Sequence, residues 1–167
     1  MISNCLMKLG MTCLLVCSAA AQSVDVALSG GAGTTRGEGS RGGLTSGFGA
    51  SGTYWTATSM GIGVDYFRLK GKGDNAVRHA VSAKFILQAR GKTFRPFVAA
   101  GAGWLNSRQG DVFNSPSGSN NSVVGLFEGG VSIHLSEKFF LRPAVRSYIY
   151  SGPLIAVMPV VSVGMTF

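Results

Sequence analysis

The chain has 167 residues, a formal net charge of +8 and 13% charged residues, about half the share of roughly 25% that is usual in globular domains. Its length suits one ordinary domain. The 46% of hydrophobic residues and the 25 glycines exclude a disordered, highly charged chain and a charged helical bundle, and favour a β-rich protein in an apolar setting.

The first 21 residues have the pattern of a secretory signal. Lys8 precedes an apolar stretch over 9–17, and small residues at 18–21 fit the cleavage pattern of such signals. We therefore expect a signal peptide over 1–21 and a mature domain over 22–167. A membrane anchor helix is the alternative, but its apolar core of about nine residues is short of the roughly 20 that cross a bilayer.

The cysteines all lie in this predicted signal. They are Cys5, Cys13 and Cys17. A lipid-modified cysteine is a further alternative for this segment, but it needs a small preceding residue, and Val16 precedes Cys17. A mature domain without cysteine excludes disulfide frameworks, thiolate metal sites and cysteine nucleophiles.

The mature segment alternates apolar and polar residues, which predicts β-strands. The last strand shows the pattern best, because Val161, Val163, Met165 and Phe167 alternate with small or polar residues. No stretch after residue 22 approaches 18 uninterrupted apolar residues, which excludes a helical membrane protein. In chain order, we predict strands over 24–30, 47–56, 59–69, 76–89, 94–105, 122–135, 139–150 and 156–167.

The predicted connections alternate in length. Those over 31–46 and 106–121 are long and that over 70–75 is of medium length, whereas the turns over 56–59, 90–93 and 136–138 are tight. Long extracellular loops alternating with short periplasmic turns are typical of outer-membrane barrels. We therefore predict an all-β fold, an eight-stranded antiparallel up-and-down transmembrane β-barrel with both chain ends on the periplasmic side.

A soluble lipocalin-type barrel also has eight alternating strands, so the polar face of each strand must decide. That face consists mostly of Gly, Ser, Ala and Thr with a few charged residues, which suits a narrow interior better than a soluble exterior. Aromatic residues near strand ends are expected to form two interfacial girdles, with a packed soluble core as the alternative. The aromatic residues concerned are Tyr54, Trp55, Tyr66, Phe67, Phe94, Trp104, Phe139, Phe140, Tyr148, Tyr150 and Phe167.

Counting the alternation also predicts a charged network inside the lumen. Inward charges must pair or be hydrogen-bonded, and we expect Glu128 to pair with Arg142 or Arg146 and Asp65 to pair with Lys84. This network would fill the lumen and block the flow of water and ions; a narrow or gated pore is the alternative. The residues predicted to face inward are Asp65, Arg78, Lys84, Glu128, His134, Arg142 and Arg146.

Two stretches and the C-terminal strand carry a resemblance to a known family. FRPFVAAGAGW (94–104) and FEGGVSIHLSEKFFLRPAVRSY (127–148) resemble the outer-membrane β-barrel family that includes the OmpA-like transmembrane domain and the OmpX- and OmpW-type small barrels. The strand with Val161, Val163, Met165 and Phe167 resembles the signal that such proteins present to the barrel assembly machinery. The resemblance covers residues 22–167 and implies a location in the bacterial outer membrane.

Catalytic and cofactor sites find little support. His134 shares the inward face with Ser132 and Glu128, away from the acyl chains that a lipid A deacylase attacks. His79 faces outward but lacks a neighbouring acid. The glycine-rich segments lack the Gly-Lys-Ser/Thr of a phosphate-binding loop, and metal-ligand spacing is absent. We expect neither enzyme activity nor a cofactor.

The remaining functional signal lies in basic residues that we place in loops: Arg36, Arg41, Lys70, Lys72 and Arg108. At the outer rim they would face the phosphates of lipopolysaccharide, although ordinary solvated loop charge is the alternative. No aromatic-and-basic nucleic-acid motif is present. The prediction is therefore a monomeric barrel with a structural or surface-interaction role, such as adhesion or ligand binding, in contact with outer-membrane lipid, lipopolysaccharide and the barrel assembly machinery; a narrow pore for small solutes is the alternative.

Overall fold

A computed structural model of the chain describes residues 23–37, 40–57, 59–71, 77–108, 119–150 and 155–167. The predicted signal peptide over 1–21 lies outside the described residues. Within the described ranges, no helix is long and apolar enough to cross a membrane.

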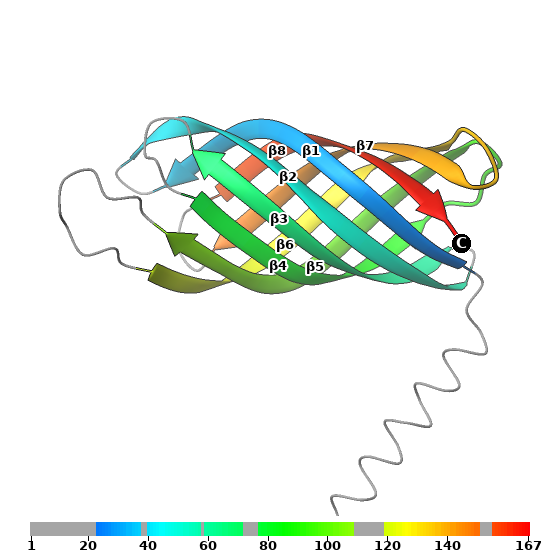
Figure 1. The fold of residues 1–167 in the computed structure, drawn as a ribbon, viewed down its shortest axis with the longest axis horizontal. Coiled ribbons are helices and arrows are strands. Elements are labelled where there is room, and N and C mark those ends of the chain that lie inside the picture. Colours follow the sequence, from blue (N-terminus) through cyan, green and yellow to red (C-terminus); the bar gives the residue numbers. More distant parts are fainter. Residues whose placement is uncertain (1–22, 38–39, 58, 72–76, 109–118, 151–154) are drawn as a thin grey trace, which may run out of the picture.

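Eight antiparallel strands form a closed barrel in which each strand pairs with its neighbours in sequence and β1 pairs with β8 (Figure 1). The fold class is thus the one predicted. The start of β1 and the end of β8 lie together, which we call the terminal end; the opposite end is the distal end. The strands are β1 (Ser23–Gly37), β2 (Ser40–Ala57), β3 (Met60–Gly71), β4 (Val77–Gln88), β5 (Phe94–Arg108), β6 (Ser119–His134), β7 (Phe139–Tyr150) and β8 (Ile155–Thr166).

The two faces of each strand differ as the alternation predicts. Val161 and Val163 are 49% and 57% exposed on the outer wall, whereas Glu128 and Arg142 are each 4% exposed inside. Successive side chains of a strand point to opposite faces, so a period-two pattern places one set outside and the other in the lumen. The predicted sidedness is confirmed.

The strand ends in the glycine-rich segment differ from the prediction. The expected loop over 31–46 is wrong, because β1 extends to Gly37 and β2 begins at Ser40. An added Cβ at Gly33 would lie 2.2 Å from the carbonyl oxygen of Val157 in β8. Glycine permits this close approach of two strands, so it marks a crowded part of the sheet. The connection expected over 106–121 is also shorter than predicted, because β5 and β6 stay paired out to Arg108 and Ser119.

The predicted aromatic girdles are wrong for several residues. Trp55, Phe67, Phe140 and Tyr148 are buried in the lumen, while their sequence neighbours Tyr66 and Phe139, like Trp104, are exposed on the outer wall. Adjacent residues of a strand cannot both face lipid. One member of each adjacent pair therefore fills the interior.

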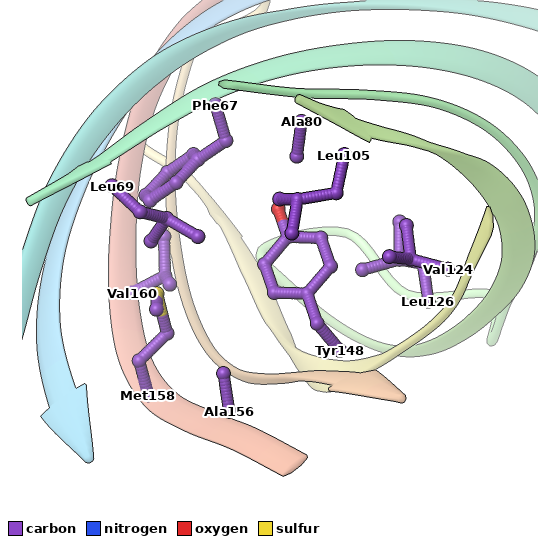
Figure 2. Close-up of a cluster of buried hydrophobic side chains, with 10 residues drawn as sticks. All are labelled: Phe67, Leu69, Ala80, Leu105, Val124, Leu126, Tyr148, Ala156, Met158 and Val160. Carbon is purple, nitrogen blue, oxygen red and sulfur yellow. The ribbon is translucent and has the colours of Figure 1, made fainter. Parts of the chain in front are cut away.

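Large apolar side chains occupy the distal half of the lumen, which the sequence reading did not foresee. Figure 2 shows this distal cluster, in which side chains from six strands point toward one another across the axis. Its members are Phe67, Leu69, Ala80, Leu105, Val124, Leu126, Tyr148, Ala156, Met158 and Val160. A smaller cluster comprises Trp55, Ile86, Phe97, Ala99 and Ala144.

Candidate functional site

A central network of four charged side chains crosses the lumen. Lys84 from β4 lies 2.8 Å from Asp65 Oδ2 on β3 and 2.9 Å from Glu128 Oε2 on β6. Arg146 from β7 places Nη2 at 2.9 Å from the same Glu128 oxygen and at 3.5 Å from Asp65 Oδ1. Each side chain is at most 2% exposed. The central network thus links strands on opposite sides of the barrel.

The charges of the central network balance. Two cations face two anions, and each carboxylate contacts both cations. Burying a charge costs several kcal/mol unless it is paired and hydrogen-bonded, and mutual pairing meets that condition. The Arg146 guanidinium also lies 5.0 Å from the ring centre of Phe67 and donates a 3.5 Å hydrogen bond to the Tyr148 hydroxyl. Arg146 therefore joins the central network to the distal cluster.

A second polar cluster lies nearer the terminal end and is centred on Asp25. Its Oδ2 accepts hydrogen bonds from Trp55 Nε1 at 2.8 Å and Arg142 Nη2 at 3.1 Å, and its Oδ1 accepts one from the Thr166 hydroxyl at 2.7 Å. These residues come from β1, β2, β7 and β8. Because β1 and β8 are the first and last strands, the Asp25 cluster ties together the seam where the barrel closes.

The structure brings together four of the seven residues expected inside. Asp65 meets Lys84, and of the two arginines considered for Glu128 the partner is Arg146, which pairs with it in the β6–β7 register. Arg142 lies four residues away along β7, about 13 Å at the usual rise, and pairs with Asp25 instead.

Asp25 is a member of the site that sequence reasoning missed. Its neighbours Val24 and Val26 are exposed, and Asp25 itself is 4% exposed. It therefore follows the same alternation that identified the other inward charges. Extending the count to the first predicted strand would have found it.

Arg78 and His134 lie apart from these clusters along the strands. Arg78 stands near the distal start of β4 and is half-buried. His134 ends β6, where its half-buried ring lies 6.0 Å from that of Phe140. Both have the inward phase, but each is near a rim, so they extend the polar lining toward the two ends.

The basic residues expected in loops lie mostly in strands. Arg36, Arg41 and Arg108 belong to β1, β2 and β5, and Lys70 is exposed on β3; the loop placement is wrong because these strands extend beyond their predicted ends. Lys72 lies outside the described residues. At the C-terminal strand, Val161 and Val163 face outward, Met165 is half-buried and Phe167 is 72% exposed.

The described residues contain no group of three or more His, Cys, Asp or Glu side chains able to hold a metal ion. What the lumen does contain is a neutral ion cluster enclosed by aromatic and aliphatic side chains. Such an arrangement fills space and links strands.

Solved structures share this fold. The N-terminal β-barrel domain of Pseudomonas aeruginosa OprF has a TM-score of 0.65 at 18% identity, covering 88% of this chain and 99% of that one. Neisserial surface protein A has a TM-score of 0.74 at 14% identity, covering 87% and 97%. Ail, the attachment invasion locus protein of Yersinia pestis, has a TM-score of 0.64 at 12% identity, covering 87% and 98%. No protein-family model matches the sequence, and no curated protein sequence matches it significantly. The chain has the fold of the small eight-stranded outer-membrane barrels.

Proposed function

We propose that the chain is an exported outer-membrane barrel with a structural or surface-interaction role, and that its lumen is closed by its own side chains. The fold shared with small outer-membrane barrels and the apolar outer wall support the location. On this proposal the segment 1–21 is a cleaved signal peptide and the terminal end faces the periplasm.

The observation that supports a closed lumen is that two groups of side chains, the central network and the distal cluster, fill it one after the other along the barrel axis. The central network fills the middle of the barrel with paired charges, and the distal cluster covers it with apolar side chains, of which Phe67, Leu126 and Tyr148 are at most 1% exposed. An apolar constriction opposes the entry of water and ions. An ion entering from the distal side would pass Arg78 near the rim and would then meet this apolar layer.

Conductance in planar bilayers tests the closed lumen. We expect the refolded protein to produce no stepwise currents. A narrow pore for small solutes is the alternative function, supported by the charged lining of the central network; regular unitary openings would establish it and overturn the closed lumen.

The membrane location has a separate test. A folded barrel should partition with membranes and migrate differently on gels before and after heating, whereas a soluble protein would do neither. The mass of the exported protein reports whether residues 1–21 are removed.

Incubation with lipid A tests for enzyme activity, and loss of an acyl chain would contradict a non-enzymatic role.

The surface role is proposed from charge. The Ail structure was also determined in complex with the heparin analogue sucrose octasulfate, and the present chain without Lys8 of the proposed signal peptide has a net charge of +7. A polyanionic partner such as lipopolysaccharide fits this excess of positive charge, with Arg36, Arg41, Lys70, Lys72 and Arg108 as candidate contacts.

We further propose that the strand ending in Phe167 is the signal for the barrel assembly machinery and that the folded protein is a monomer. Sedimentation in detergent tests whether the folded protein is a monomer.

A further inference from the structure

On β3 to β6, the outer wall changes from apolar to polar along one line of paired residues, whereas Phe48, opposite Arg68 on β2, is apolar and exposed. The β-sheet register places Arg68 of β3 opposite His79 of β4, His79 opposite Asn106 of β5, and Asn106 opposite Asn121 of β6. All four have the outward phase, and the two asparagine side chains share a 2.7 Å hydrogen bond. One step toward the terminal end, the corresponding outward residues include Tyr66, Val81, Trp104 and Val123.

The height of this line matches a membrane boundary. Met60 begins β3 at the terminal end of the barrel, and Arg68 follows eight residues later. For a strand tilted by ~40°, these eight residues raise Arg68 about 20 Å above Met60 along the barrel axis. The apolar band of a membrane barrel is about 25 Å tall. Toward the distal end (Figure 1), the outward side of β3 continues from Ile62 and Val64 to Tyr66, Arg68 and Lys70. Arg68 therefore lies at the height where hydrocarbon gives way to lipid headgroups.

The charges on this part of the wall are all positive. Among strand residues whose side chains the structure describes, Arg68 and Lys70 are the charged residues with the outward phase. No ion pair within the described ranges joins either of them to a carboxylate. The Arg68 guanidinium lies 5.8 Å from the ring centre of Phe48, a contact that holds it against the wall. A fixed, uncompensated guanidinium at a headgroup boundary is suited to an anion.

Tyr66 and His79 complete the arrangement. The Tyr66 hydroxyl lies 2.7 Å from His79 Nδ1, and the two rings stack with centres 6.0 Å apart. When the hydroxyl donates to Nδ1, a neutral imidazole has its proton on Nε2, which is then a second hydrogen-bond donor beside Arg68. Arginine binds phosphate through two parallel N–H donors.

We propose that Arg68 and His79, positioned by Tyr66, form a binding site for a phosphate of an outer-leaflet glycolipid of the lipid A type. The site lies on the outer wall of the barrel, with Lys70 as a second cation above it and Trp104 as apolar surface for acyl chains beside it. This inference rests on the proposed outer-membrane location and names one phosphate contact for the lipopolysaccharide proposed above.

The test measures lipid binding to the folded, detergent-solubilised protein by native mass spectrometry. The probes are bisphosphorylated lipid A, chemically dephosphorylated lipid A and phosphatidylglycerol. We expect Arg68→Gln to weaken binding of bisphosphorylated lipid A about tenfold, the loss of one charge-assisted contact, without changing binding of the dephosphorylated form. Arg90→Gln is the matched control, because it removes the same charge from an exposed turn at the terminal end and should leave binding unchanged.

The tyrosine is tested as a positioning residue. Tyr66→Phe keeps the ring and removes the hydroxyl, so it should weaken lipid A binding only while His79 is present. The double variant with His79→Gln should then bind no more weakly than His79→Gln alone. Additive losses would overturn the positioning role.

Three results would overturn the site itself: equal binding by Arg68→Gln and Arg90→Gln, equal binding of the two forms of lipid A, or equal loss of phosphatidylglycerol and lipid A in Arg68→Gln. The heat-dependent gel shift separates this failure from that of the proposed function. A protein that folds as a barrel in membranes but shows no lipid A preference lacks the site, whereas one that does not enter membranes contradicts the proposed location.

Discussion

Glu128 shows how a single carboxylate supports the interior of the barrel. It is the side chain that contacts Lys84 and Arg146 at 2.9 Å each, and its own side chain is 1% exposed. Removing its charge leaves two buried cations facing Asp65 alone. The net charge of the central network then changes from zero to +1 in a place that water does not reach.

The first prediction concerns this imbalance. Glu128→Gln should lower the free energy of unfolding by about 3–5 kcal/mol, the usual cost of breaking a buried ion pair, measured by urea unfolding in lipid vesicles. Glu137→Gln removes the same charge from an exposed turn and should change stability by less than about 0.5 kcal/mol.

A compensating variant separates charge imbalance from packing. Lys84→Met together with Glu128→Leu leaves the Asp65–Arg146 pair and no excess charge, so it should be more stable than Glu128→Gln. If the double variant is the less stable of the two, the loss arises from packing and the electrostatic account is wrong.

Between neighbouring strands, glycine decides how closely the backbones approach. At Gly103 of β5, an added Cβ would lie 2.1 Å from the Val81 carbonyl oxygen and 2.6 Å from Ser82 Cα, both on β4. These are backbone atoms, so no rotamer change relieves the contact. At Gly52, on the outward face of β2, the same Cβ would meet nothing within 4 Å.

The second prediction compares these two glycines. Gly103→Ala should destabilise the barrel by about 1–3 kcal/mol, as overpacking commonly does, whereas Gly52→Ala should be neutral or slightly stabilising because alanine reduces the freedom of the unfolded chain. The urea midpoint of each variant provides the measurement. Similar midpoints would show that β4 and β5 can separate without cost.

The strands at the seam are joined by side chains as well as by backbone pairing. Asp25 of β1 contacts Arg142 of β7 and Thr166 of β8, and the Arg142 guanidinium lies 4.5 Å from the ring centre of Phe140. Without Asp25, Arg142 is a buried cation among aromatic rings.

The third prediction follows from that loss. Asp25→Ala should lower stability by about 3–5 kcal/mol and lower the temperature at which the folded band disappears on gels. Thr166→Val, which removes one hydrogen bond across the β1–β8 seam, should cost about 1 kcal/mol. Equal effects of the two variants would mean that the pairing of Arg142 contributes little.

On the scale of the whole molecule, the central network and the distal cluster, which we propose as two seals of the lumen, have different chemistry and should fail separately. Breaking the central network leaves the distal cluster in place, with Phe67, Leu126 and Tyr148 still filling the distal half. Making the distal cluster polar gives water a path to the charges beneath it.

The fourth prediction is therefore about conductance. Glu128→Gln should remain electrically silent in planar bilayers, whereas Phe67→Ser combined with Leu126→Ser should show current openings that the wild type lacks. The gel shift identifies the folded fraction of each sample. Openings in Glu128→Gln alone would place the seal in the central network instead of the distal cluster.

The sequence by itself determined the number of strands and the sidedness of most of their length, because alternation with period two is a local property that needs no knowledge of neighbours. It also placed Asp65, Lys84, Glu128 and Arg146 inside. The alternation gives Phe67 and Trp55 the opposite phase to their neighbours Tyr66 and Tyr54. The girdle prediction grouped aromatic residues only by their nearness to strand ends, so it missed this difference in phase.

Only the tertiary structure decided which charges meet and where strands end. Arg142 and Arg146 have the same phase, and the cross-barrel geometry alone assigns one to Asp25 and the other to Glu128. Gly31 and Gly33 look like part of a loop in isolation, yet they lie in β1, where β8 approaches within contact distance. Arg142 and Asp25 are 117 positions apart in the chain, and Gly33 and Val157 are similarly distant, so no local pattern contains these contacts.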